Sequence, residues 1–359
     1  MPGWAHHPFY VVVSLGLLLT AGAALAASAA VLLVLRAGRR WRERRQMPIE
    51  APTRALIFDY LMASPEEERE ALDALERLGR VQRREVTFQL ESLGPHLRGD
   101  AQQRARALLE AHGVARRALR RVRSRRVVTR CRGLATLGSL GAAEHVAVVA
   151  QHLDDPSRLV RRVAVRALGG LSAHGVSDGI LDVVARDPEA IADAATALDQ
   201  IGEDAVPRLR AHLTAALAHP VEGDQVGPLV ARALGRLQDL DSVPDLAEAA
   251  LTAPLALRLG AIDALGSIES AVSADTLLRL LDAGEPWMKG AAARALGRLG
   301  TPQAIPDLLG VVADGDPIAA RRAADALLAI GAQGRDALAA SGAPYAVEAS
   351  ALAVLRGRA

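Results

Sequence analysis

The side chains that could carry chemistry in this chain are few, and histidine is the first of them. His145 and His152 are seven residues apart, as are His212 and His219, so each pair lies on about one helix face. Metal ligands stand closer together and usually include a carboxylate, so both pairs indicate solvated or hydrogen-bonded histidines. The single cysteine, Cys131, is interpreted as a small buried apolar residue. The sequence therefore predicts no metal and no cofactor.

Catalytic and nucleotide-binding motifs are also missing from the sequence. The glycines at Gly169, Gly170, Gly175 and Gly179 lie in a turn without the lysine or the preceding strand that a phosphate-binding loop needs. No serine stands in a nucleophile elbow. We therefore expect a protein without catalytic residues.

Arginine is the one chemically active residue type that gathers in the sequence. Between Arg116 and Arg132, nine arginines fall within 17 residues. A solvated pair of helices is one interpretation of this charge density. The other is contact with anionic lipid headgroups or an acidic partner surface, where each arginine near a charged leaflet contributes up to about 1 kcal/mol. The candidate contact residues are Arg116, Arg117, Arg120, Arg121, Arg123, Arg125 and Arg126.

The net charge of +2 conceals two regions of opposite sign. Residues 36–132 include 24 basic and 13 acidic residues, whereas residues 133–359 include 19 basic and 28 acidic residues. The second region also has few aromatic residues that could stack on bases. Nucleic acid is therefore not expected as a partner.

The elements that would position these residues come from an internal repeat. Its most regular member is a leucine that recurs every 30 or 31 residues, with one spacing of 36. This leucine series is Leu137, Leu168, Leu198, Leu234, Leu265, Leu296 and Leu327. Small or apolar residues recur four positions before each leucine and three positions after it, which is the spacing of one helix face.

Turn residues divide each repeat into two helices. Glycines that could end the first helix in a left-handed conformation are Gly141, Gly202, Gly300 and Gly331. Prolines that suit the first turn of the second helix are Pro207, Pro244 and Pro306. The one spacing of 36 residues places an insertion between His219 and Gly227. The sequence therefore predicts an all-α fold, a right-handed α-solenoid of helical pairs.

Two segments carry a resemblance to a known family: DDPSRLVRRVAVRALGGL, from Asp154, and MKGAAARALGRLGTPQAIPDLL, from Met288. They resemble HEAT repeats of the short bacterial type, which is also found in phycobilin lyase subunits. The resemblance covers residues 128–355 well and 55–127 loosely. It implies a curved stack of antiparallel helix pairs that acts more often as a scaffold than as an enzyme. HEAT-type metalloenzymes similar to deoxyhypusine hydroxylase carry His-Glu dipeptides, which this chain lacks.

A transmembrane helix is predicted over residues 9–35, because these 27 residues carry no charge and a span needs about 20. A cleaved signal peptide is the alternative, but no basic segment precedes the run. Arginines follow the run directly and none precedes it, so the N-terminus is expected outside and the repeats in the cytoplasm. Gly22, Ala26 and Ala30 have the spacing that lets two such helices pack closely, with lipid exposure as the alternative.

The predicted organisation therefore has five parts. They are a short extracytoplasmic N-terminus (1–8), the transmembrane helix (9–35), a basic linker (36–53), degenerate helical repeats (54–127) and the HEAT-repeat array (128–359). Localisation in the cytoplasmic membrane follows from this order.

The function predicted from these features is that of a non-catalytic, membrane-tethered scaffold with protein partners, among them a membrane protein. One span, a basic helical segment and short HEAT repeats together resemble bacterial membrane proteins associated with polysaccharide-synthesising glycosyltransferases. That resemblance implies an accessory subunit of such an enzyme. A phycobilin-lyase-like enzyme subunit and a solenoid that senses a small ligand are the alternatives.

Overall fold

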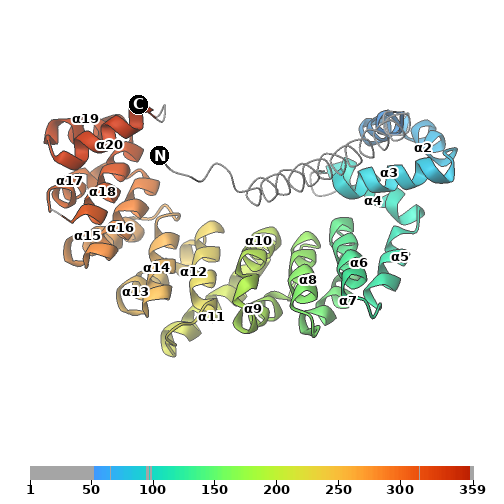
Figure 1. The fold of residues 1–359 in the computed structure, drawn as a ribbon, viewed down its shortest axis with the longest axis horizontal. Helices are drawn as coiled ribbons and strands as arrows, with labels where there is room; N and C mark the ends of the chain where they lie inside the picture. The colour runs from blue at the N-terminus through green and yellow to red at the C-terminus, as the bar shows by residue number, and fades with distance from the viewer. Residues whose placement is uncertain (1–51, 65, 94–96, 98, 315, 356–359) are drawn as a thin grey trace, which may run out of the picture. The chain divides into compact units, whose positions relative to one another are not determined.

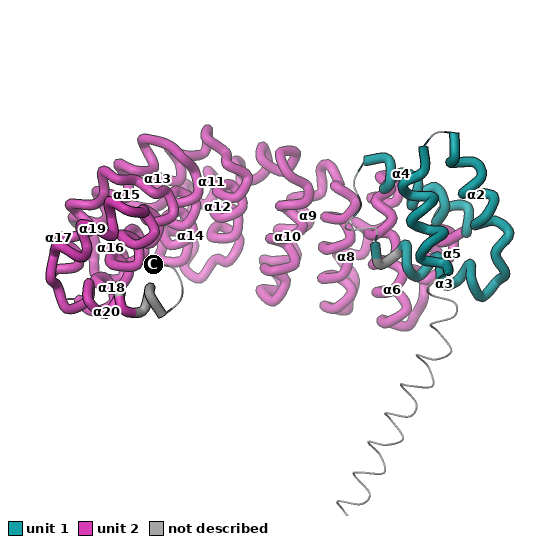
Figure 2. Tube along the Cα trace, turned by 90° about the horizontal axis from the view of Figure 1, so that it is seen from above, with its two compact units in different colours: residues 1–112 teal, residues 113–359 magenta. Residues whose placement is uncertain are grey.

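The computed structural model describes residues 52–355, apart from 65, 94–96, 98 and 315. All regular structure in these residues is helical, and no strand occurs among them. The chain divides into two compact units, residues 1–112 and 113–359, which Figure 2 shows in different colours. The prediction of an all-α fold is therefore confirmed for the described residues.

The described part of unit 1 is a small group of helices around leucine side chains. Its helices are a segment over 52–62, α2 (Glu68–Glu76), α3 (Arg80–Leu93) and α4 (Gly99–Ala111). Leu75, Leu90 and Leu108 contribute one buried side chain each from α2, α3 and α4. Arg104 of α4 donates from Nη1 to the carbonyl oxygen of Ala63 at 2.7 Å, which satisfies a carbonyl just after the first helix.

Unit 2 begins with α5 (Val114–Val122) and continues as two rows of helices (Figure 1). The even row is α6 (Val127–Leu140), α8 (Arg158–Gly170), α10 (Ile191–Ile201), α12 (Val226–Arg236), α14 (Leu255–Leu265), α16 (Pro286–Leu299), α18 (Pro317–Ile330) and α20 (Pro344–Leu355). The odd row is α7 (Val146–Ala150), α9 (Ser177–Arg186), α11 (Val206–Ala218), α13 (Val243–Thr252), α15 (Ala271–Ala283), α17 (Ile305–Ala313) and α19 (Ala332–Ser341). Successive members of the even row lie side by side, as do those of the odd row from α9 onward. Unit 2 thus has the architecture of a helical-pair solenoid.

The leucine series lies in the even row, and each of its seven side chains is fully buried. Burial of a leucine side chain stabilises a fold by about 1.5–3 kcal/mol. Because every even helix buries the same face, the repeat explains why the helices stack instead of separating.

Close contact between neighbouring even helices depends on glycine. In five of them the residue after the leucine is glycine, namely Gly138, Gly169, Gly235, Gly266 and Gly297. A Cβ atom on any of these would lie 2.6–2.8 Å from the Cα atom of an alanine in the next even helix. That alanine directly precedes the next leucine of the series, so one three-residue motif forms both sides of the contact.

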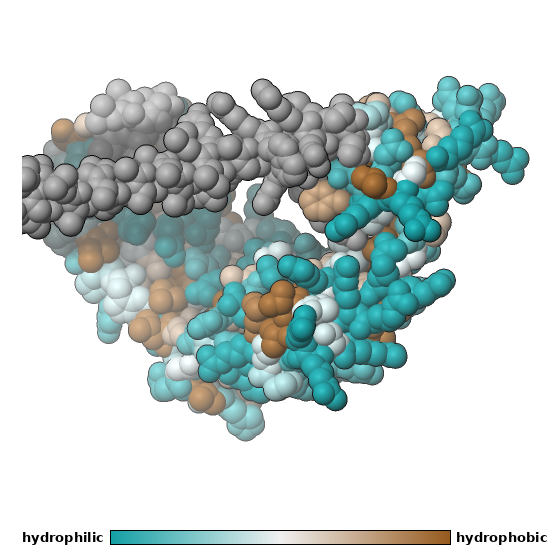
Figure 3. All heavy atoms as spheres, turned by 45° about the vertical axis from the view of Figure 1, so that its right-hand side comes forward, coloured by the Kyte–Doolittle hydropathy of each residue, from teal (hydrophilic) through white to brown (hydrophobic). Residues whose placement is uncertain are grey.

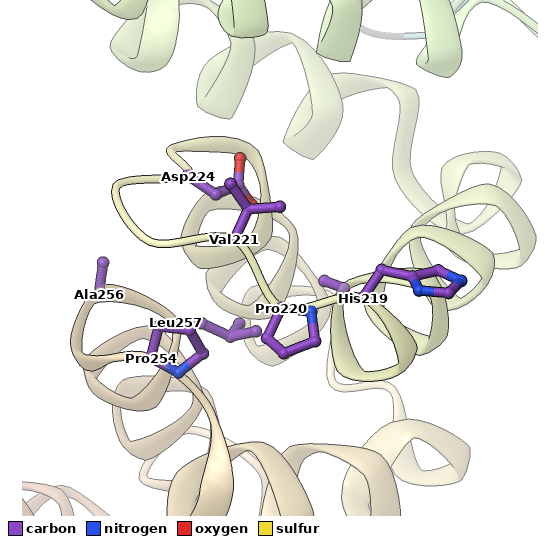
Figure 4. Close-up of a pocket in the computed structure, with 8 residues that line it drawn as sticks. His219, Pro220, Val221, Asp224, Pro254, Ala256 and Leu257 are labelled. Atoms are coloured by element: carbon purple, nitrogen blue, oxygen red, sulfur yellow. The ribbon is translucent and has the colours of Figure 1, made fainter.

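The contact between α10 and α12 departs from this pattern, at the one spacing of 36 residues. Asp199 stands where those five helices have glycine, and its two carboxylate oxygens accept from Nε of Arg236 at 2.7 and 2.8 Å. The extra residues lie between α11 and α12, where Asp224 caps α12 by accepting from the amide of Gly227 at 2.7 Å. Figure 4 shows this turn beside Pro254 and Leu257 at the start of α14. The insertion predicted between His219 and Gly227 is where the longer turn occurs.

The predicted localisation in the cytoplasmic membrane is contradicted by the described helices. None of them is long and apolar enough to cross a membrane. The longest labelled helices in this part have 14 residues, about 21 Å, against a bilayer core of about 30 Å. The span predicted over 9–35, with Gly22, Ala26 and Ala30, lies outside the described residues. The localisation is therefore not retained.

Candidate protein-binding surface

Helix α5 carries the arginines of the predicted contact site, and its packing determines which way they face. Val114, Ala118 and Val122 recur every four residues and are at most 2% exposed. They form the side of α5 that packs on α6. A Cβ atom on Gly133 of α6 would lie 2.8 Å from Val122 Cγ1 and 2.9 Å from the carbonyl oxygen of Ala118. The glycine therefore lets α5 lie directly on α6, with its arginines turned outward.

The exposed side of α5 and the turn that follows it form a continuous group that we call the arginine face. Its members are Arg116, Arg117, Arg120, Arg121, Arg123, Arg125 and Arg126, and all seven are exposed. Arg117 has an interaction partner, and the other six form no ion pair with another described residue. The seven predicted residues are thus brought together. Figure 3 turns this end of the chain forward and shows a mostly hydrophilic surface with small hydrophobic patches.

Arg130 belongs to the same run of sequence, but its role is structural. Its Nε donates to Asp155 Oδ2 at 2.9 Å and its Nη2 donates to Asp155 Oδ1 at 2.8 Å. Its Nη1 also donates to the carbonyl oxygens of Ser124 and Arg125, both at 3.1 Å. Arg130 therefore fixes the turn that carries part of the arginine face.

The carboxylate that holds Arg130 is itself well satisfied. Burial acts to raise the pKa of Asp155, but hydrogen bonds from Arg130 and from the amide of Ser157 outweigh it and lower the pKa. Asp155 therefore stays ionised at neutral pH, which keeps the bidentate pair intact.

His152 supplies a second attachment for α5. Its Nδ1 lies 2.9 Å from the carbonyl oxygen of Val148, and its Nε2 lies 3.1 Å from the carbonyl oxygen of Val122, the last residue of α5. These contacts agree with the interpretation of His152 as a hydrogen-bonded histidine. They connect the end of α5 to the segment that follows α7.

The other residues considered for chemistry are separated. His145 is 5% exposed, whereas His212 Nε2 lies 3.0 Å from Asp178 Oδ1 on α9. Burial raises the pKa of the Cys131 thiol, which disfavours the thiolate form. Within the described residues no three histidine, cysteine, aspartate or glutamate side chains gather in a way that could hold a metal ion.

Sequence reasoning missed that charge in unit 2 is sorted by row. The even helices carry 14 basic and 5 acidic residues, and the odd helices carry 5 basic and 8 acidic residues. The segments between the helices, from residue 141 to 343, carry 15 acidic and no arginine or lysine residues. The overall acidic balance of this region therefore hides a basic row. Counting charge by position in the repeat would have found it.

A group of charged residues on three neighbouring even helices shows this concentration of arginines in the even row. Asp263 of α14 faces Arg232 of α12 at 3.5 Å, Arg294 of α16 at 2.9 Å and Arg298 of α16 at 3.2 Å. With Arg236 and its partner Asp199, these residues form what we call the arginine–aspartate strip. It contains four guanidinium groups and two carboxylates.

Comparison with known proteins identifies the repeat. The family model of HEAT repeats matches residues 224–297, 254–330 and 277–355, so HEAT repeats are present in this part of unit 2. The resemblance predicted from the sequence is confirmed to that extent. No curated protein matches the chain in sequence.

Solved structures give similarity of fold alone. Human deoxyhypusine hydroxylase in complex with glycerol is 23% identical, covers 68% of this chain and 97% of its own, and has a TM-score of 0.29. The complex of CpcE and CpcF of phycocyanin lyase from Nostoc sp. PCC7120 is 20% identical, covers 63% and 92%, and has a TM-score of 0.35. An engineered protein is 18% identical, covers 83% and 93%, and has a TM-score of 0.33.

Proposed function

We propose that this chain is a non-catalytic scaffold that binds an acidic surface of a protein partner through the arginine face. The observation that carries the proposal is the exposure of these seven guanidinium groups, six of which have no ion pair with a described residue. Elsewhere in unit 2 many arginines are paired with carboxylates, as Arg162 is with Asp193 at 2.7 Å. Arginine suits carboxylate partners because its planar fork can donate two parallel hydrogen bonds.

Contacts on the buried side of α5 and in the turn after it hold the arginine face in place. The contact of α5 with Gly133, the pair of Arg130 with Asp155 and the contacts of His152 all restrain the helix or its following turn. A fixed array of guanidinium groups loses less conformational entropy on binding than a flexible one. A repeat protein offers such surfaces because stacked units extend one face over a long distance.

The experiment measures binding of the full chain to fluorescein-labelled poly-L-glutamate by anisotropy. The triple variant Arg116→Gln, Arg120→Gln, Arg121→Gln is expected to bind at least fivefold more weakly, and the loss should shrink as salt rises. The matched control removes three exposed arginines of the odd row, Arg186, Arg208 and Arg335, and should change affinity less than twofold. Equal losses in both variants would show that only net charge matters, and would remove the arginine face as the site.

A second measurement tests the scaffold role. A photo-crosslinking amino acid at position 120, compared with one at position 335, should capture the same acidic peptide of one protein in repeated preparations. Capture of unrelated peptides, or equal capture from both positions, would contradict the proposal. The accessory role beside a glycosyltransferase gains no support from the described residues and forms no part of it. The lyase-like and ligand-sensing alternatives stay predictions.

A further inference from the structure

The arginine–aspartate strip has more guanidinium groups than its carboxylates can neutralise. Asp263 is shared by three arginines, and the side chains of these arginines are 39–44% exposed. Each guanidinium has five N–H donors, and two carboxylates cannot satisfy the donors of four of them. The strip therefore keeps donors and a net positive charge on the solvent side of α12, α14 and α16.

Four helices of the same row carry an exposed apolar side chain at their first or second position, and we call these four side chains the apolar edge. Val128 of α6, Leu159 of α8, Leu255 of α14 and Ile318 of α18 are 51–67% exposed. These exposed apolar side chains recur on helices that also carry the basic charge. They lie at helix N-termini, whereas the four arginines of the strip lie in the middle or at the end of α12 and α16.

A hollow lies at the start of α14, beside Leu255 of the apolar edge. It has a volume of about 420 Å³ and is lined by Pro220, Leu255, Arg258 and Trp287, among others. The guanidinium carbon of Arg258 lies 5.9 Å from the centre of the Trp287 ring, within the range of a cation–π contact. Pro220 comes from the insertion, so the departure from the 31-residue repeat helps to form the hollow.

The distance from this hollow to the strip suits an extended polypeptide. Leu255 and Asp263 are eight residues apart on α14, which is about 12 Å along a helix. An extended chain covers about 3.3 Å per residue, so four residues span that distance. An acidic side chain at the strip and an apolar one in the hollow would thus stand about four residues apart.

We infer that the α12–α16 part of the even row binds an extended acidic segment of a partner protein, with an apolar side chain about four residues from its acidic residues. This inference rests on the proposed function in taking a protein as the partner, but it concerns a different surface. Charge complementarity favours carboxylates at the strip. Trp287 is the one tryptophan among the described residues that could stack on a base, so a single-stranded nucleic acid fits less well than an acidic polypeptide.

The test measures binding of the full chain to three labelled probes at equal ionic strength. The first is a peptide of about 12 residues, with two adjacent glutamates and a leucine four residues further on. The second has serine in place of that leucine, and the third is oligothymidylate of similar length. We expect the leucine peptide to bind at least fivefold more tightly than either of the others. Equal or tighter binding of the oligonucleotide would overturn the inference.

Variants distinguish this surface from the arginine face. The double variant Arg232→Gln, Arg294→Gln should weaken binding of the leucine peptide at least fivefold, and Trp287→Ala should abolish its advantage over the serine peptide. Asp263→Asn removes the carboxylate that competes for the three arginines, so it should strengthen binding at least threefold, a gain that misfolding cannot mimic. No gain with Asp263→Asn would contradict the inference. The triple variant of the arginine face should leave this peptide's affinity within twofold, and a larger loss would assign the peptide to that face.

Discussion

Gly235 in α12 and Ala264 in α14 approach so closely that the glycine has no room for a β-carbon. A Cβ atom at position 235 would lie 2.6 Å from Ala264 Cα and 2.8 Å from Ala264 Cβ. Both obstacles belong to the backbone or are fixed directly to it, so they cannot move aside as a flexible side chain can. The spacing of α12 and α14 therefore depends on this glycine.

Replacement of Gly235 by alanine is expected to destabilise unit 2. Alanine favours a helix over glycine by about 0.5–1 kcal/mol, but the overlap with Ala264 forces the helices apart and should cost about 1–3 kcal/mol net. The measurement is the urea midpoint of unfolding. The matched control is Gly310→Ala in α17, where a Cβ atom would meet nothing within 4 Å, so this variant should be more stable than the parent. Similar stability changes in both variants would contradict the role given to the contact.

The pair of Arg130 and Asp155 should matter more for stability than the pair of Arg236 and Asp199. The side chains of the first pair are 13% and 7% exposed, and those of the second are 38% and 40% exposed. Loss of one partner of a buried pair costs about 3–5 kcal/mol, whereas an exposed pair contributes about 1 kcal/mol or less. Asp155→Asn should therefore lower the free energy of unfolding by about 2 kcal/mol or more, and Asp199→Asn by less than about 1 kcal/mol. Equal effects in chemical denaturation would show that burial does not separate the two pairs.

Much of the fold was predictable because one helix face repeats. The buried leucine series and the prolines of the second helices follow directly from the spacing, and Pro207, Pro244 and Pro306 indeed lie in the first turns of α11, α13 and α17. All four predicted glycines have positive φ, but only Gly141 and Gly300 are left-handed in the α sense. Gly202 and Gly331 have ψ of −141° and −150°, which lies outside the left-handed α region. The sequence shows where glycine is needed, but ψ depends on the turn that follows.

The candidate surfaces were predictable to different degrees. The arginine face is contiguous in sequence, so its density was visible without a structure. The arginine–aspartate strip joins α10, α12, α14 and α16, whose repeats follow one another at spacings of 36, 31 and 31 residues, so no local window contains the whole strip. The distinction between Arg130 and the arginines of the face could not be predicted either, because it depends on Asp155, 25 residues away.

His152 should control the order of α5, because its Nε2 contacts the carbonyl oxygen of the last residue of that helix. Replacement by alanine removes this contact and the one to Val148. Faster hydrogen exchange is expected at the amides of α5, with unchanged exchange in α14 to α18, since local openings need not spread through a repeat protein. His174→Ala is the control, because His174 is exposed and forms an ion pair with the exposed carboxylate of Asp204. Uniform exchange changes along unit 2 would contradict a local role.

Low pH should lower the free energy of unfolding of unit 2, and protonation of Asp239 should account for part of this loss. Hydrogen bonds from Arg210 lower the pKa of this buried carboxyl group below its ordinary value of 3.8, and the bond from Ser242 adds to the effect. A group with a lowered pKa in the folded state stabilises the fold at pH values above 3.8, and this stabilisation is lost as pH falls through the folded-state pKa. Asp239→Asn should therefore be less stable than the parent at pH 7, and the difference should shrink progressively below about pH 4.

The measurement for Asp239 is the free energy of unfolding by urea at a series of pH values from 7 downward. Asp241→Asn serves as the control, because the Asp241 carboxylate lies 2.9 Å from the same Arg210 but its side chain is 77% exposed. An exposed pair of this kind contributes about 1 kcal/mol or less, so the control should follow the parent at every pH. A difference between Asp239→Asn and the parent that stays constant from pH 7 into acid would mean that the lost interaction does not depend on the charge of Asp239.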